Sequence, residues 1–455
     1  MARSHGMESI SYSASPAPSR KARMQQVNVH TPKGWMNDPN GFIYYKGEYH
    51  LFYQHFPYAP TWGTICWGHM TSKDLVSWEQ HDVALFPTKP EDQNGCFSGS
   101  AVEKDGELHL FYTGVHYDQA DPDNINKAIE GQLTSAQLHV VSPDGYTFDN
   151  FTKKSVIIPA ITDPTVGDRT HTRDPKVWRG EDAWYLVLGS NIDRKQGEVL
   201  FYRSEDLDHW ELVNRSLLDP SYGWMCECPD VFEVDGRDVF ISSAMHKEAG
   251  MIDTSVWTMA DFDPKTCDFK TTTAPEPIDY GHDFYAPQTT VDAEGRRVMI
   301  GWMRMPEPVD NEWIGMFCAP RVLRVVDGRV HFSLHPAIRE AIAAGKVGVP
   351  GGNRARLVKT MMHDGEYINV GGFIVWQEGG RIYTDRSLVY RPNDTYPYLQ
   401  STTPEVGEET EIEILASDNI IEVYVNDGEY VISNVVYGLD HTLSTNSTDI
   451  AVLGF

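Results

Sequence analysis

Short runs in which apolar and polar residues alternate, separated by glycine, proline, asparagine and aspartate, fill most of the chain. Alternation with a period of two predicts β-strands, and turn residues between the runs predict hairpins. One phrase recurs five times: a polar or proline-marked start, a short apolar strand, a turn at Gly or Asp, and a second strand. These phrases begin at Asp38, Phe97, Arg173, Glu227 and Phe284. We therefore expect an all-β protein.

A second phrase, SxDLxxW, follows two of the hairpins, at Ser72–Trp78 and Ser204–Trp210. Weaker versions occupy Ser142–Phe148 and Met259–Phe269. The two phrases together make a four-stranded unit whose starts recur at roughly 55 to 75 residues, which is typical of propeller blades with long loops. This pattern predicts a five-bladed β-propeller. A long β-sandwich array is the alternative, but it would not need five equivalent starts.

The pattern divides the chain into four regions. Residues 1–26 are polar and expected to be flexible, and residues 27–332 form the propeller. Residues 333–352 are a linker that contains a short helix near Pro336–Ala344, where Ala, Ile, Arg and Glu favour a helix. Residues 353–455 alternate again and contain a hairpin signal, which predicts a β-sandwich used for packing or for ancillary sugar contact.

Composition excludes several classes of partner. The formal net charge of −27 over 455 residues would repel nucleic acid and anionic membranes, whereas a neutral substrate is indifferent to it. The sequence contains no run of about 18 apolar residues, so no membrane span is predicted. The N-terminus has no apolar secretory core, which favours a cytoplasmic protein. The six cysteines have no regular spacing, so we expect reduced, partly buried thiols and neither a metal nor a cofactor.

The starts of the five phrases carry the candidate chemistry. In a propeller the innermost strand of each blade begins near the central channel, so residues at the starts should meet at one mouth. The residues placed there are Asn37, Asp38, Phe97, Ser98, Arg173, Asp174, Glu227, Asp283 and Tyr285. Several carboxylates on one axis repel each other, which indicates a functional site.

The segment WMNDPNG, Trp35–Gly41, also reads as an ordinary turn, because Asn, Asp, Pro and Gly favour tight backbone. Its proline holds the preceding Asp38 in an extended conformation and so fixes the direction of the carboxylate. Trp35 and Met36 before it suggest the wall of a site rather than a solvated loop.

Cleavage of a sugar acetal needs two carboxyl groups in unlike environments. Glu227 lies between two cysteines and after Trp224 and Met225, a weakly polar setting that should raise its pKa and make it the proton donor. Asp38 lies among hydrogen-bond donors that favour its ionised form, so we assign it as the nucleophile. Asp174 should stay charged beside Arg173 and hold substrate hydroxyls, although an ordinary surface ion pair is the alternative.

These motifs also carry a resemblance. WMNDPNG, the triplet Arg173–Pro175, the triplet Glu227–Pro229 and the intervening FSGS, Phe97–Ser100, resemble glycoside hydrolase family 32, which contains invertases, sucrose-6-phosphate hydrolases and fructanases. The resemblance extends from about His30 to the C-terminus. It implies a propeller followed by a β-sandwich and a retaining, two-step attack on a β-fructofuranosyl unit.

The resemblance also implies site residues. Asp38 would be the nucleophile, Glu227 the acid/base and Asp174 the stabiliser of the transition state. Contacts with the fructosyl unit are expected from Trp35, Met36, Asn37, Gln54, Trp62, Phe97, Ser98, Arg173, Tyr285 and Trp302. The aromatic residues among them could equally be core residues, but apolar ring faces cover sugars well.

The sequence thus predicts a β-fructofuranosidase that acts on sucrose or short fructo-oligosaccharides. Hydrolysis of sucrose-6-phosphate and fructosyl transfer remain alternatives on the same site, and Lys33, Lys247 and Arg304 could bind a phosphate. Outside the enzymes, a catalytically silent fructan-binding protein is the second class of hypothesis. A monomer and a homodimer are equally compatible with the sequence.

Overall fold

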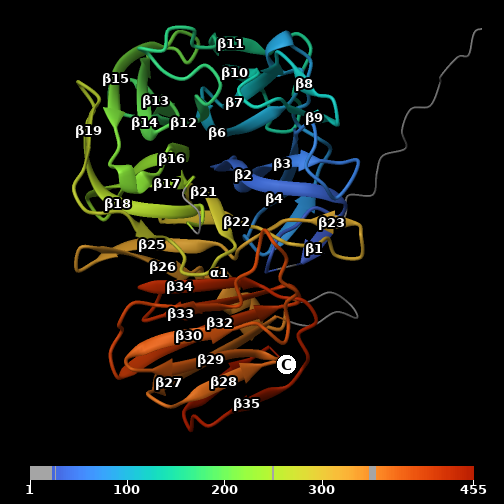
Figure 1. The fold of residues 1–455 in the computed structure, drawn as a ribbon, viewed down its shortest axis with the longest axis vertical. Coiled ribbons are helices and arrows are strands. Elements are labelled where there is room, and N and C mark those ends of the chain that lie inside the picture. Colours follow the sequence, from blue (N-terminus) through green and yellow to red (C-terminus); the bar gives the residue numbers. More distant parts are fainter. Residues whose placement is uncertain (1–22, 26, 248–250, 348–354, 455) are drawn as a thin grey trace, which may run out of the picture.

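Strand-forming aromatic and β-branched residues, cut by turn residues, give a chain of short strands. The computed structural model describes residues 23–25, 27–247, 251–347 and 355–454, and within them all sheets are made of such strands and a single α-helix is present (Figure 1). The predicted all-β class is confirmed. No helix in this described part is long and apolar enough to cross a membrane.

Five sheets follow one another along the first three quarters of the chain, each containing four antiparallel strands in sequence order. The first contains β1 (Arg23–Gln25), β2 (Gly34–Tyr45), β3 (Glu48–Phe56), β4 (Cys66–Ser72), β5 (Ser77–Gln80) and β23 (Trp313–Ile314). The second contains β6 (Cys96–Lys104), β7 (Glu107–Tyr117), β10 (Leu133–Ser142) and β11 (Ser155–Ile158). The third contains β12 (Arg173–Arg179), β13 (Trp184–Ile192), β14 (Gln196–Ser204) and β15 (Glu211–Leu217).

The fourth sheet contains β16 (Met225–Val234), β17 (Arg237–Met245), β18 (Thr254–Asp263), β19 (Asp268–Thr271) and β20 (Glu276–Pro277). The fifth contains β21 (Phe284–Val291), β22 (Arg297–Met303), β24 (Met316–Phe317), β25 (Arg321–Val326) and β26 (Arg329–Leu334). A small hairpin, β8 (Ala120–Asp121) and β9 (Asn124–Ala128), and two 3₁₀ turns, η1 (Pro90–Asp92) and η2 (Pro220–Tyr222), lie in the loops.

The first strands of the five sheets form a closed ring. Strand β2 contacts β6, β6 contacts β12, β12 contacts β16, β16 contacts β21, and β21 contacts β2. Side chains become less buried with distance from this ring. All but the last residue of β13 are buried, whereas no residue of the outer strand β15 is buried. The starts of the five first strands therefore share one region of the molecule.

The SxDLxxW phrase is a repeated turn between the third and fourth strands of a sheet. In the first sheet Oδ1 of Asp74 accepts hydrogen bonds from the backbone N–H groups of Val76 and Ser77, at 2.9 and 2.6 Å. Leu75 takes a positive φ of 62°, and its carbonyl accepts from Nε1 of Trp78. Asp206, Leu207 and Trp210 repeat this arrangement in the third sheet.

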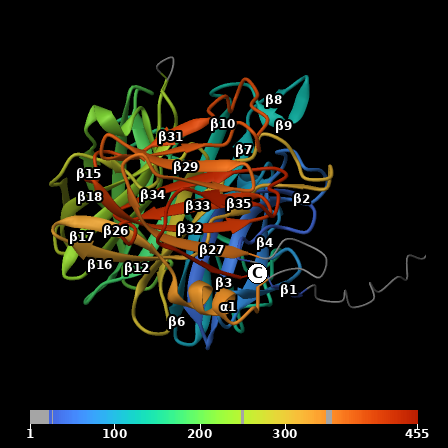
Figure 2. The same cartoon turned by 90° about the horizontal axis from the view of Figure 1, so that it is seen from below.

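Two further sheets lie beside the ring, next to β25 and β26 of the fifth sheet (Figures 1 and 2). One contains β27 (Arg356–His363), β32 (Glu409–Ser417), β33 (Ile420–Val425), β34 (Tyr430–Val435) and β36 (Ile450–Leu453). The other contains β28 (Tyr367–Val370), β29 (Phe373–Glu378), β30 (Arg381–Asp385), β31 (Gln400–Thr402) and β35 (Leu443–Thr445). Apolar residues from both form one core. We call them the C-terminal sheets.

Buried ion pairs join the C-terminal sheets to the ring. Arg321 of β25 lies 2.8 Å from Asp279 and 3.4 Å from Glu422 of β33, and all three side chains are fully buried. Arg386, after β30, pairs with Asp283, which precedes β21, and these side chains are also fully buried. Asp283 was expected at the mouth of the ring, and this expectation is wrong because its carboxylate is used in the contact with the C-terminal sheets.

The segments between these regions match the predictions only in part. Helix α1 (Pro336–Ala343) forms where it was expected, with proline in its first turn and Nδ1 of His335 accepting from the N–H of Ala337. Of the N-terminal segment expected to be flexible, Arg23–Gln25 pair with β5 as strand β1, while residues 1–22 and 26 lie outside the described residues. Residues 348–352 of the expected linker also lie outside them.

Candidate active site

The first strand of each of the five sheets carries a bulge at the same place, where two of its residues face one residue of the second strand. The five bulged pairs are Asn37–Asp38, Phe97–Ser98, Asp174–Pro175, Cys228–Pro229 and Ala286–Pro287. A bulge bends its strand and redirects a side chain, and bulges are frequent next to active sites. The repeat therefore places five bulges, which carry different side chains, at one end of the ring. We call these bulges the corners.

Three of these corners have strained backbone. Asp174, Cys228 and Ala286 have φ values of 64°, 46° and 48°, and a proline follows each of them. Non-glycine residues in this region cost of order 1–3 kcal/mol each and persist where the surrounding structure holds them. The backbone of Asp174 is held by a hydrogen bond, in which its N–H donates to Oγ1 of Thr113 at 2.9 Å.

The corners surround a cavity of about 340 Å³. Its floor contains all three carboxylates that the sequence singled out, Asp38, Asp174 and Glu227. Eight of the ten predicted substrate contacts also line it: Trp35, Asn37, Gln54, Trp62, Phe97, Arg173, Tyr285 and Trp302. Residues from positions 35 to 302 of the chain thus meet in one cavity.

Asp38 is held by three polar neighbours. Oδ2 accepts from Oγ of Ser98 at 2.6 Å and from Nε2 of Gln54 at 3.2 Å, and Oδ1 accepts from Nδ2 of Asn37 at 3.1 Å. The expected donors are present, but burial outweighs them and, with the negative charge of Glu227, raises the pKa of Asp38 to about 6. The carboxylate is therefore ionised at neutral pH and protonated in moderate acid.

Glu227 has polar partners on both oxygens. Oε1 accepts from the guanidinium of Arg173 at 2.7 Å, and Oε2 accepts from the hydroxyl of Tyr285 at 2.7 Å. The weakly polar setting predicted from its neighbours in the sequence is wrong. Strand alternation turns Cys226 to the other face, into the core of the third and fourth sheets, while Glu227 faces the cavity.

Asp174 is nearly inaccessible, with an exposed fraction of 6%. Its Oδ2 accepts from the backbone N–H of Cys228 at 2.9 Å, and the nearest guanidinium nitrogen of Arg173 is 3.9 Å away. Burial raises the pKa of Asp174, although Arg173 opposes this and the charges of Glu227 and Asp38 add to it. Asp174 is therefore not part of a surface ion pair with Arg173. It also does not stay firmly charged beside Arg173, as the sequence led us to expect.

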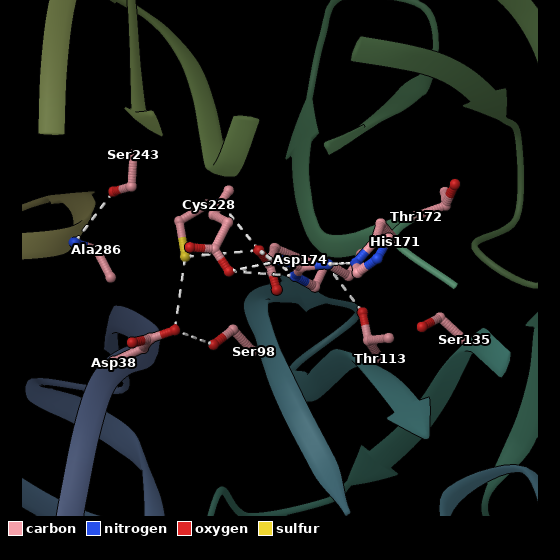
Figure 3. A network of polar contacts seen from close by, with 12 residues as sticks. Asp38, Ser98, Thr113, Ser135, His171, Thr172, Asp174, Cys228, Ser243 and Ala286 are labelled. Carbon is pink, nitrogen blue, oxygen red and sulfur yellow. Dashed lines mark hydrogen bonds and ion pairs between the residues drawn. The ribbon is translucent and has the colours of Figure 1, made fainter. Parts of the chain in front are cut away.

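The thiol of Cys228 lies between two of the carboxylates. Its Sγ is 3.7 Å from Oδ2 of Asp38 and 3.7 Å from Oδ2 of Asp174 (Figure 3). Burial and the three nearby carboxylates raise the pKa of the thiol well above its ordinary value, so it remains a neutral S–H donor. All six cysteines of the chain are described, and all are buried and free of disulfides.

Aromatic rings form two groups around the carboxylates. Trp302 lies 6.0 Å from Trp35 and 6.5 Å from Tyr285 between ring centres, and Trp62 lies edge-on to Phe97 at 6.1 Å. Nε1 of Trp35 donates to Oδ1 of Asn37 at 2.7 Å, which fixes the indole. Such a lining of apolar faces with a few fixed polar groups suits a neutral polyhydroxylated ligand.

Two predicted contacts do not line the cavity. Met36 is fully buried in the core of the first and fifth sheets, since the side chains before and after it along β2 face the cavity and its own faces away. As a substrate contact Met36 is therefore a wrong prediction. Ser98 is also buried and acts on Asp38 through its hydroxyl rather than on the cavity directly.

Four lining residues were missed: Leu133, Ser135, Thr170 and His171. Leu133 and Ser135 lie in β10, the third strand of its sheet, which no argument from strand starts could reach. His171 is two residues before Arg173, and its Nδ1 lies 3.1 Å from the Arg173 guanidinium. Because side chains two residues apart on an extended chain point to the same side, the prediction for Arg173 could have been extended to His171. Within the described residues, no group of three His, Cys, Asp or Glu side chains is arranged to hold a metal ion.

Comparison with known proteins identifies a family and several relatives with similar sequences. Residues 29–336 match the glycosyl hydrolases family 32 N-terminal domain. A sucrose-6-phosphate hydrolase of Zymomonas mobilis is 38% identical in an alignment of 322 positions that covers 65% of this chain and 59% of that protein. The matched part thus spans less than two thirds of that relative's length. A sucrose-6-phosphate hydrolase of Escherichia coli is 33% identical over 89% of this chain and 87% of its own length.

Solved structures agree with the sequence comparison. A family 32 β-fructofuranosidase of Bombyx mori superposes with a TM-score of 0.76 at 29% identity, covering 94% of this chain and 92% of that one. A sucrose-6-phosphate hydrolase of Lactobacillus gasseri superposes with a TM-score of 0.78 at 23% identity, over 93% and 91% of the two chains, and supports the fold. From the family match, the relative from Escherichia coli aligned over most of both chains, and the shared fold, this chain belongs to glycosyl hydrolase family 32.

Proposed function

We propose that this protein is a retaining β-fructofuranosidase that hydrolyses the terminal β-D-fructofuranosyl unit of sucrose and short fructo-oligosaccharides. The observation that carries the proposal is the meeting of Asp38, Asp174 and Glu227 in one cavity whose lining also includes aromatic rings, neutral amides and the guanidinium of Arg173. Family membership supports the same reaction class. Asp38 is the nucleophile, Glu227 the acid/base, and Asp174 the stabiliser of the transition state.

The first step forms a fructosyl-enzyme. An oxygen of Asp38 attacks the anomeric carbon while Glu227 gives its proton to the glycosidic oxygen, so the C–O bond breaks and the leaving sugar departs as a neutral alcohol. In the second step Glu227 takes a proton from water, the water oxygen attacks the anomeric carbon, and the bond to Asp38 breaks. Two inversions at the same carbon give fructose with retained configuration.

The neighbours of the carboxylates support these roles. Ser98, Gln54 and Asn37 hold both oxygens of Asp38, which limits the rotation of the attacking group. Arg173 and Tyr285 hold Glu227 at the other side. Asp174, fixed by the N–H of Cys228, can accept hydrogen bonds from sugar hydroxyls, and in its ionised form it places negative charge beside the positive charge that develops on the sugar ring.

Sucrose-6-phosphate is the second candidate substrate. The relatives from Zymomonas mobilis and Escherichia coli are both named for its hydrolysis, whereas a variant of the Bombyx mori enzyme was solved in complex with sucrose. The net charge of −27 favours the uncharged sugar for this chain. We further propose action in the cytoplasm on small sugars, without nucleic acid or membrane partners. Fructosyl transfer and a silent fructan-binding protein are the remaining alternatives.

The architecture is part of the proposal. We assign the five sheets to a five-bladed β-propeller over residues 27–332, supported by the closed ring of first strands. Residues 333–352 are the linker with its helix, and residues 353–455 are a β-sandwich, supported by the core shared between the C-terminal sheets.

The proposal is tested by comparing turnover of sucrose, sucrose-6-phosphate, 1-kestose, inulin and levan by the unmodified protein. We expect the highest kcat/KM on sucrose or 1-kestose, and β-fructose as the first product by NMR. A higher kcat/KM on sucrose-6-phosphate would favour the second candidate. Binding of sucrose without release of glucose would leave only a binding protein.

The role of Glu227 has its own test. Glu227→Ala should be inactive on sucrose, because the leaving sugar is no longer protonated. On β-fructofuranosyl fluoride, whose leaving group needs little help from an acid, azide should restore turnover and yield β-fructofuranosyl azide, since azide needs no general base to attack the fructosyl-enzyme. Failure of azide to restore any turnover, with Asp38 intact, would remove the acid/base role from Glu227.

A further inference from the structure

The two C-terminal sheets differ in what their faces contact. The sheet that contains β32 and β33 lies between the ring and the other sheet, because Leu415 and Tyr424 pack with residues of β26 while Ile414 and Val423 pack against the other sheet. In Figure 1, β28 and β29 accordingly lie farther from the ring than β33 and β34. The sheet of β28, β29, β30, β31 and β35 therefore has one face on the shared core and a second face that points away from the ring. We call this second face the outer face.

Aromatic side chains form a row across the outer face. Strand alternation buries the residue next to each of them in the shared core, so the side chains of the row point outward: Tyr367, Trp376 and Tyr383. Trp376 is the direct partner of Tyr367 on one side and of Tyr383 on the other. The rings of Trp376 and Tyr383 are stacked, with centres 5.2 Å apart and planes inclined by 16°. Since neighbouring strands lie about 4.8 Å apart, the row extends over about 10 Å.

A second, mostly polar row lies beside the rings on the same face. Its members are direct partners across five strands, in the order Ser444, Asn369, Ile374, Asp385 and Gln400. Asp385 is the only charged residue in the two rows, and its Oδ2 accepts from Nε2 of Gln400 at 2.7 Å. In a chain with a net charge of −27, two rows with a single charged side chain suit an uncharged ligand.

We propose that the outer face binds a chain of neutral sugar units, at a site separate from the active site. Sugar rings stack on the faces of Trp376 and Tyr383, since aromatic rings cover the apolar faces of sugars, and the amides and hydroxyl of the second row exchange hydrogen bonds with sugar hydroxyls. The chain that we assign to this face is a β-fructan. This assignment rests on the proposed function, because fructosyl units are what the active site is proposed to cleave. The C-terminal sheets thereby hold the protein on a polymer as well as packing against the ring.

Affinity electrophoresis in gels that contain inulin, levan or dextran tests the site. All proteins carry Asp38→Asn, so that the polysaccharide is not degraded, and sucrose in the gel occupies the active site. We expect inulin or levan to retard the parent protein, and Trp376→Ala to weaken the apparent affinity by about tenfold. Trp376→Phe keeps a ring and should retain most of the retardation. Phe151→Ala is the matched control, because Phe151 is 69% exposed between β10 and β11 and lies outside the row.

With Asp38 intact, Trp376→Ala should keep the kcat/KM of the unmodified protein on sucrose, which separates loss of the binding site from a folding defect. Equal retardation of Trp376→Ala and its parent, or no retardation by either fructan, would overturn the inference. Retardation by dextran alone would overturn the assignment to a fructan. A changed oligomeric state of Trp376→Ala by light scattering, with unchanged retardation, would show that a second copy of the chain covers this face instead. If the unmodified protein does not cleave sucrose but its retardation by fructan depends on Trp376, the proposed function fails and the binding site stands.

Discussion

The guanidinium of Arg173 donates to Oε1 of Glu227 at 2.7 Å, although the carboxylate of Asp174 is the next residue in the chain and lies 3.9 Å from the nearest guanidinium nitrogen. The bulge at Asp174 explains why Arg173 contacts Glu227 and not Asp174, since the bulge turns the side chain of Asp174 toward the N–H of Cys228. Arg173 therefore connects the third sheet to the fourth and orients the proposed proton donor.

Replacing Arg173 by Met should lower kcat/KM on sucrose by about 100-fold or more, because a misplaced catalytic group loses its alignment with the substrate. Arg173→Lys keeps the charge but not the planar fork, so its loss should be intermediate. The measurement is kcat/KM on sucrose and on β-fructofuranosyl fluoride, whose leaving group needs less help from an acid. A smaller loss on the fluoride indicates action through Glu227. Equal losses would show that Arg173 acts on the fructosyl unit itself.

The raised pKa of Asp38 predicts the acidic limb of the pH profile. An ionised Asp38 is required for attack, and its pKa is about 6, so kcat/KM should fall about tenfold per unit below that pH. Ser98 donates to Oδ2 of Asp38 and stabilises the charged form. Ser98→Ala should therefore move the limb to higher pH, whereas Ser216→Ala, on the outer strand β15, should leave it in place. A limb that stays fixed in Ser98→Ala would contradict this account.

The same pKa makes Asp38 a cost to stability. An aspartate in the unfolded chain titrates near 4, so between about pH 4 and 6 the folded protein binds the proton more tightly than the unfolded chain. The free energy of unfolding contributed by this group therefore falls as pH rises through that interval and stays low above it. Asp38→Asn has no charge to bury.

Asp38→Asn should consequently be inactive and yet more stable than the unmodified protein at pH 7, by about 2 to 3 kcal/mol. The gain should shrink as pH falls toward 4, where Asp38 is already protonated. Thermal unfolding of both proteins at several pH values checks this. A variant that is less stable at pH 7, or a gain that does not change with pH, would show that the hydrogen bonds to Asp38 outweigh its burial.

The sequence was sufficient for those parts of the fold that depend on local pattern. Hairpin phrases and SxDLxxW turns are encoded in neighbouring residues, so the five starts and the convergence of Asp38, Asp174 and Glu227 could be predicted. The bulges could not, because a bulge exists only relative to the partner strand. The Asn37–Asp38 bulge places Asp38 at the cavity while Met36, two residues earlier, stays in the core.

Partners distant in the chain account for the other errors. Glu227 looked weakly polar because its neighbours in sequence are Cys226 and Cys228, but its two oxygens contact Arg173 and Tyr285, 54 and 58 residues away. Composition around a residue does not report which side chains reach it from other strands. Such contacts become predictable only after the fold is known.

Asp283 is the strongest case of a distant partner, since Arg386 is 103 residues away from it. The carboxylate also accepts from the N–H of Val435 at 2.8 Å, and both charged side chains are fully buried. Removing one member of a buried pair leaves the other charge without compensation, which typically costs about 3 to 5 kcal/mol. The pair therefore fixes the C-terminal sheets against the strand that begins with Phe284.

Arg386→Met should accordingly lower the Tm of the protein strongly, whereas Arg324→Met should change it little. Arg324 pairs with Asp427 at the surface, where the two side chains are 46% and 44% exposed, and exposed pairs contribute only about 0 to 1 kcal/mol. The double variant Arg386→Met with Asp283→Leu removes both charges and should recover part of the lost Tm. If the double variant is as unstable as the sum of the single variants, Arg386 and Asp283 stabilise the protein independently and not as a pair.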